Sequence, residues 1–192
     1  MPPSPSLAEM RSYLESYLRH GGPLEQRAAR GEELEPDERA LLVGRLLRLL
    51  TRLHVSREKM LERRAGPDLS FAEAMVEQGR AAFRRALENH EITEELDRKV
   101  DFRVEQLRFG HVYHEMTGHY HDLLAARSEV EALVRELPEL PASVLARDLL
   151  SSVDTALKDK HPKLEELWVG PFGRLDDFAV AYPRSHWWWY QR

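Results

Sequence analysis

Apolar residues recur at helical spacing from close to the N-terminus. Leu7, Met10 and Leu14 lie three and four positions apart, which places them on one face of an α-helix. The Ser-x-x-Glu pattern of a capping box overlaps the start of this run, and a glycine pair ends it. The pattern therefore predicts a first helix over 7–20, and the segment 23–30 is expected to add a short second one.

A leucine-rich helix is expected to run from Pro36 to about Ala65. A proline fits the first helical turn, and Asp37 and Glu38 beside it stabilise the positive end of the helix dipole. The apolar positions that follow include Leu41, Leu42, Leu46, Leu49, Leu50 and Leu53. They cover more than one narrow stripe, which is typical of a buried helix. Packing within the chain is favoured for these leucines, and the alternative is the seam of a homodimer.

The next helix is predicted from Ser70 to about Asn89. Ser70 and Glu73 form a second capping-box pattern, which is a typical helix start. The expected interior positions are Phe71, Ala74, Met75, Ala82, Phe83 and Leu87.

A long helical segment is predicted to follow, from Thr93, a favourable N-cap residue, to Leu137, where prolines stop it. Few helices of this length are straight, so a kink or interruption is expected at Gly110 or Gly118. A final helix is predicted over 143–159, and the His-Pro step after it ends the helical pattern.

The C-terminal segment 169–192 is rich in glycine, proline and aromatic residues and has no long helical period. Strand signals are few in the whole chain. We therefore predict an all-α protein: a helical bundle of about five to seven helices over 1–168, with 169–192 as an irregular segment packing on it. The final SHWWWYQR is expected to fold back and cover the bundle, because so much aromatic surface is costly to leave in water. The alternative is a recognition tail that binds a partner.

Composition narrows the function classes. Of 192 residues, 42% are hydrophobic and 32% are charged, which excludes the composition of disordered chains. A net charge of −5 offers no basic field for nucleic acid, so nucleic acid is not the expected partner. The absence of cysteine excludes disulfides, thiolate metal ligands and iron–sulfur clusters. No signal peptide or membrane span is recognisable, and we expect a cytoplasmic protein.

The most unusual stretch is GHVYHEMTGHYHD, residues 110–122, which holds four of the nine histidines together with a glutamate and an aspartate. At about 100° of rotation per residue, the apolar stripe of the predicted helix continues directly into this stretch. The apolar members of the stripe are Leu96, Val100, Val104 and Leu107, and its polar continuation is His111, His114, Glu115 and Asp122. The core-facing side of the helix therefore turns polar at His111.

Buried polar groups need partners, because each one left without a partner costs about 1–3 kcal/mol. A metal ion is one solution. The candidate ligands are His111, His114, Glu115, His119 and Asp122. Several of these are three, four or seven positions apart, which lets side chains on one helix converge. Imidazole and carboxylate ligands suit zinc, iron, manganese or nickel, in a metal-dependent enzyme or a small-ligand binder. The alternative is a hydrogen-bonded or partly solvated histidine cluster without metal.

Two other catalytic interpretations use the same region. Residues 121–122 form the His-Asp pair of helical metal-dependent phosphohydrolases, for which His90 and Asp154 would supply the remaining ligands. Arg108 and His114 have the spacing of an Arg and His pair that cleaves RNA without metal. Both are weaker than the metal-site hypothesis. The residues that flank the His-Asp pair do not fit the phosphohydrolase pattern, and the spacing of Arg108 and His114 recurs in this chain by chance.

A non-catalytic function remains the main alternative to a metal site. The chain would then be a helical interaction or adaptor protein that meets a partner through the leucine-rich helix or the aromatic tail. In that case the histidines would be structural or would sense pH.

Overall fold

The structure is a computed structural model that describes the backbone of residues 5–63, 66–117, 120–160 and 181–190. Side chains are described in these ranges except at 5–6, 110–117, 120–121 and 160. These residues form seven α-helices and one short 3-10 helix, and no β-strand occurs among them. The predicted all-α class and the number of helices are confirmed.

The helices are α1 (Pro5–His20), α2 (Gly22–Ala29), α3 (Pro36–Glu62), α4 (Gly66–Ala86), α5 (His90–Thr117), α6 (Tyr120–Glu136), α7 (Pro141–Lys160) and η3 (Trp187–Trp189). Their contacts divide the chain into two compact units, Met1–Lys99 and Val100–Arg192. The predicted domain boundary at residue 168 lies outside the described residues. No helix in the described ranges is long and apolar enough to cross a membrane.

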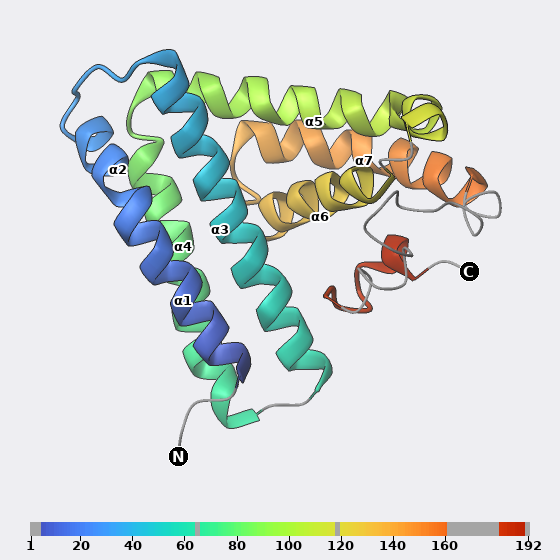
Figure 1. The fold of residues 1–192 in the computed structure, drawn as a ribbon, viewed down its shortest axis with the longest axis horizontal. Helices are drawn as coiled ribbons and strands as arrows, with labels where there is room; N and C mark the ends of the chain where they lie inside the picture. The colour runs from blue at the N-terminus through green and yellow to red at the C-terminus, as the bar shows by residue number, and fades with distance from the viewer. Residues whose placement is uncertain (1–4, 64–65, 118–119, 161–180, 191–192) are drawn as a thin grey trace. The chain divides into compact units, whose positions relative to one another are not determined.

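The first unit has α3 at its centre, packed against both α1 and α4, and Figure 1 shows these three helices side by side. The leucines of α3 form much of its core: Leu42, Leu46, Leu49, Leu50 and Leu53 are all at most 4% exposed. At Gly79 of α4, an added Cβ would lie 2.8 Å from Leu53 Cδ1, so the two helices approach closely there. The expectation that the leucine run packs within the chain is confirmed for these five residues.

Two predicted helix starts are wrong. The helix expected from Ser70 begins at Gly66, with Pro67 in its first turn, so Ser70 lies inside α4. Its buried face is correspondingly shifted: Phe71 is 62% exposed and Ala74 is exposed, whereas Ala72 is completely buried. A capping-box pattern thus predicted a helix here but misplaced the first turn and part of the interior face.

The second wrong start concerns Thr93. Helix α5 begins at His90, and Asn89 provides the cap, because its Oδ1 accepts the Glu91 backbone N–H at 3.0 Å. Thr93 lies in the first turn and its hydroxyl donates to the Leu87 carbonyl at 3.1 Å. The start of α3, in contrast, agrees with the prediction at Pro36.

The second unit contains the C-terminal part of α5 together with α6, α7 and residues 181–190. Helix α5 ends at Thr117 and α6 begins at Tyr120, so the predicted long segment is interrupted close to Gly118. Arg103 Nε on α5 lies 3.1 Å from Glu129 Oε2 on α6. With so short a connection between them, this ion pair requires α6 to fold back beside α5. Helix α6 in turn packs against α7.

Candidate functional site

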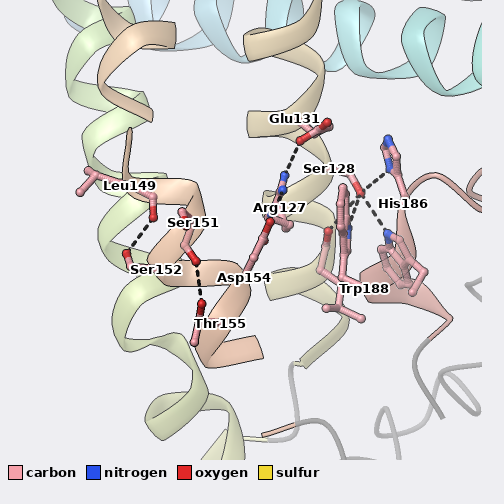
Figure 2. Close-up of polar contacts among 12 residues, drawn as sticks. Arg127, Ser128, Glu131, Leu149, Ser151, Ser152, Asp154, Thr155, His186 and Trp188 are labelled. Carbon is pink, nitrogen blue, oxygen red and sulfur yellow. Dashed lines mark hydrogen bonds and ion pairs between the residues drawn. The ribbon is translucent and has the colours of Figure 1, made fainter. Parts of the chain in front are cut away.

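The described part of the C-terminal segment is attached to α6 through Ser128. The Ser128 hydroxyl donates to the Leu124 carbonyl at 3.2 Å and accepts the indole N–H groups of Trp188 and Trp189 at 3.1 and 2.9 Å. His186 Nδ1 lies 3.0 Å from the same oxygen, as Figure 2 shows for His186 and Ser128. Trp188 and Trp189 are 2% and 3% exposed. One buried hydroxyl therefore satisfies two indole donors that would otherwise lose hydrogen bonds on burial.

This arrangement bears on two hypotheses about the tail and its chemistry. Trp188 and Trp189 are packed inside the unit, so neither is an exposed anchor for a partner. The Ser128–His186 contact has the composition of a nucleophile and a base. However, Ser128 is completely buried and its proton is directed to a backbone carbonyl, so the contact holds the fold together and presents no nucleophile.

Arg127, next to Ser128 on α6, forms a buried ion cluster. Its Nε and Nη2 donate to the two carboxylate oxygens of Asp154 on α7 at 2.8 and 3.0 Å, and its Nη1 donates to Glu131 at 2.8 Å. Only 4% of the Arg127 side chain is exposed. Its guanidinium carbon lies 4.0 Å from the Trp188 ring centroid. The cluster therefore joins α6, α7 and the C-terminal segment (Figure 2).

Arg127 and Glu131 both remain charged in this cluster. Burial alone would lower the pKa of Arg127, but the carboxylates of Asp154 and Glu131 outweigh it and the pKa is raised. Burial would likewise raise the pKa of the Glu131 carboxyl. The cations of Arg127 and Arg135 outweigh that effect and hold its pKa below the usual value. Arg135 Nε donates to Glu131 at 2.8 Å.

The lowered pKa of Glu131 predicts a defined acid sensitivity. A carboxyl with a depressed folded pKa adds stability above its unfolded pKa, about 4.3, and that stability is lost as pH falls through the folded pKa. The free energy of unfolding of the native protein should therefore fall more steeply below about pH 4.3 than that of Glu131→Gln. Urea denaturation at a series of pH values, followed by tryptophan fluorescence, measures both slopes. Equal slopes would contradict the assignment.

A cavity of about 620 Å³ lies beside this cluster, between α6, α7 and the C-terminal segment. Its volume falls within the range of about 300–1,000 Å³ that is typical of small-molecule sites. We call it the tryptophan cavity. It is lined chiefly by Arg127, Glu131, Arg135, Arg147, Asp154, Trp187 and Trp188, with Val134 and Leu150 among its apolar residues.

A second buried polar group lies in the first unit. Tyr17 donates its hydroxyl to Glu25 Oε2 at 2.7 Å, and Arg85 Nε donates to Glu25 Oε1 at 2.7 Å. Burial, with help from the neighbouring Glu25 carboxylate, raises the pKa of Tyr17. These contacts link α1, α2 and α4, and the cavity beside them measures only about 150 Å³. We interpret this group as structural.

The predicted metal ligands are distributed over the end of α5 and the start of α6. His111, His114 and Glu115 belong to the last turns of α5, but their side chains lie outside the described residues, as does His119 altogether. Asp122 is in the first turn of α6 and is exposed. Among the residues whose side chains are described, no group of three or more His, Asp or Glu could hold a metal ion.

The spacing argument for these ligands needs a correction. Several of the candidate ligands were expected to converge because they lie three, four or seven positions apart on one helix. Because α5 ends at Thr117 and α6 begins at Tyr120, Glu115 and Asp122, which are seven positions apart, belong to different helices. Convergence of these residues would depend on how the two helices meet.

The described residues of the two other catalytic interpretations are engaged elsewhere. The His90 side chain is 83% exposed and lies 3.5 Å from Glu94, while Asp154 is held by buried Arg127. Arg108 donates to Glu105 at 3.0 Å, and its guanidinium carbon lies 5.5 Å from the ring of the adjacent phenylalanine. None of these contacts places His90 or Asp154 as a metal ligand, or Arg108 as a group that acts on a phosphate.

The chain matches no protein-family model, no curated protein and no solved structure.

The buried cluster was missed by the sequence argument. The charges of the stretch 129–136 alternate in sign, a pattern typical of a solvated helix face, yet Glu136 is 3% exposed and Glu131 lies in the cluster. A usable signal was present: Arg127 and Ser128 lie among apolar positions of α6, where polar groups require partners. The indole N–H groups of the tail needed acceptors as well.

Proposed function

We propose that this protein binds a divalent transition metal where α5 and α6 meet. The ligands would be His111, His114 and Glu115 from α5, His119 from the connection, and Asp122 from the first turn of α6. The ion pair between Arg103 and Glu129 is the observation that carries the proposal. It requires α6 to fold back beside α5, which directs the two ligand-bearing helix ends toward one another.

The burial of α5 gives a second reason. Its residues Leu96, Val100, Val104 and Leu107 are 1–3% exposed and form one stripe. Since α5 continues to Thr117, positions 111, 114 and 115 extend that stripe at helical spacing. Imidazoles placed toward a core cost about 1–3 kcal/mol each without partners. Coordination to a metal would satisfy their lone pairs.

The ligand chemistry suits zinc, iron, manganese or nickel. With one coordination position left to water or substrate, the metal could polarise a substrate oxygen or lower the pKa of bound water. The proposed function is therefore a metal-dependent enzyme or a metal-dependent binder of small ligands.

Elemental analysis of protein purified without an affinity tag tests this proposal. We expect close to one metal ion per chain in the native protein and loss of that metal in His111→Ala. The matched control is His90→Ala on the same helix, since His90 is 83% exposed and lies in the first turn of α5; this variant should keep its metal. Native protein without metal, and without a thermal shift on adding any of the four metals, would contradict the proposal.

A protein-binding function is the second candidate, and the exposure of two aromatic residues of α5 supports it. Phe102 and Phe109 are 63% and 60% exposed and lie seven positions apart, on one face of the helix. Paired exposed aromatic side chains are common anchors in interfaces. A partner protein, or a second copy of the chain, would bind there rather than at the buried leucines of α3. A metal-free native protein would favour this function.

A further inference from the structure

The tryptophan cavity belongs wholly to the second unit and is independent of the proposed metal site. Helices α6 and α7 supply its charged residues, and the C-terminal segment supplies its tryptophans. All three elements are held together by the contacts of Arg127 and Ser128. The cavity therefore has walls that are already formed without a ligand, which lowers the entropic cost of binding one.

The charges of the lining are unbalanced. Three arginines, Arg127, Arg135 and Arg147, face the carboxylates of Glu131 and Asp154. Arg127 is occupied by both carboxylates. One positive charge of the lining is left without a matching carboxylate in the lining.

Arg147 is the best placed of the three arginines to receive a ligand. Its Nη2 donates to the Pro138 carbonyl at 3.1 Å, and no carboxylate of the described residues lies within ion-pair distance of it. Arg147 is exposed, so its guanidinium is accessible from solvent. A planar guanidinium of this kind binds a carboxylate with two parallel hydrogen bonds.

The remaining lining suits a flat apolar group. Val134, Leu150 and Trp187 all line the cavity. Trp187 is partly exposed, whereas the neighbouring Trp188 is buried, so Trp187 is the more accessible of the two residues. Aromatic rings gain from packing on one another beyond the area that they bury. Lys158, which is not part of the lining, has its Nζ 4.9 Å from the Trp187 ring centroid.

We propose that the tryptophan cavity binds a small aromatic acid carrying one negative charge. The carboxylate of the ligand pairs with Arg147, and its ring packs against Trp187. A single negative charge balances the excess of the lining, and a ring without polar groups matches the apolar residues.

Isothermal titration calorimetry with 2-naphthoate tests the proposal on the full chain. We expect one molecule bound per chain, with 2-naphthamide, the neutral analogue of the same shape, at least about ten-fold weaker, which corresponds to about 1.4 kcal/mol. Acetate, which has the charge but not the ring, should not bind measurably. Equal binding of the acid and the amide, or no binding of the acid at millimolar concentration, would overturn the proposal.

Arg147→Gln locates the charge that is recognised. This variant should bind 2-naphthoate about ten-fold more weakly and should lose the discrimination between acid and amide. A change of packing alone would not remove that discrimination. Arg30→Gln is the matched control, because Arg30 is exposed and lies in the first unit; it should bind as the native chain does. If Arg147→Gln keeps both the affinity and the discrimination, the assignment of Arg147 is wrong.

Discussion

Replacing Arg127 by alanine is expected to lower the free energy of unfolding by about 3 kcal/mol, at the lower end of the range for breaking a buried ion pair. The substitution leaves the carboxylates of Asp154 and Glu131 without their shared cation. These side chains are only 23% and 15% exposed. Water would solvate them incompletely, and Trp188 would also lose the guanidinium packed on its ring. Urea denaturation followed by tryptophan fluorescence measures the loss.

Arg135→Ala is the matched control for this prediction. Arg135 donates to the same carboxylate, Glu131, but its side chain is 68% exposed. Exposed ion pairs contribute only about 0–1 kcal/mol, so the control should lose little stability. Similar losses in both variants would mean that burial of Arg127 does not determine the strength of the cluster.

Replacing Leu53 by alanine is expected to lower the free energy of unfolding by about 3 kcal/mol, within the usual range of about 2–5 for buried leucines. Leu53 is completely buried. Its side chain packs against Gly79 of α4, where an added Cβ would lie 2.8 Å from Leu53 Cδ1. Gly79 has no side chain that could turn into the space left by Leu53, so a cavity should remain. Thermal and urea unfolding followed by circular dichroism measure the effect.

Leu41→Ala provides the comparison for Leu53→Ala, since Leu41 belongs to the same helix and is 46% exposed. Its loss should stay below about 1 kcal/mol, because little apolar area returns to water. Equal losses for the two leucines would contradict the role of the α3–α4 contact as the centre of the first unit.

Several helices were predictable because their signals are local. Pro36 with acidic neighbours predicted the start of α3, and the leucines after it predicted a buried helix. Ser70 and Thr93 were misleading for the same reason. Each is a good N-cap residue, but Pro67 and Asn89 offered starts a few residues earlier, and the chain used those. Local patterns indicate that a helix exists more reliably than where it begins.

The candidate sites were predictable to different degrees. The histidine-rich stretch is conspicuous in the sequence because unusual residues are crowded into it. The tryptophan cavity is not, because Arg127, Arg147 and Trp187 are brought together from separate segments. An arginine on a helix indicates a binding site only when the residues that surround it in the folded chain are known.

The sequence by itself determined the helical class, most helix positions, the burial of the leucine-rich helix and the absence of cysteine chemistry. These follow from residue type and from the period of the α-helix, which act over a few residues. The tertiary structure alone decided that Ser128 receives two indoles, that Arg127 is shared by two carboxylates, and that a cavity forms beside them. Such contacts join residues up to 61 positions apart. Their energies depend on distance and burial, which no local pattern specifies.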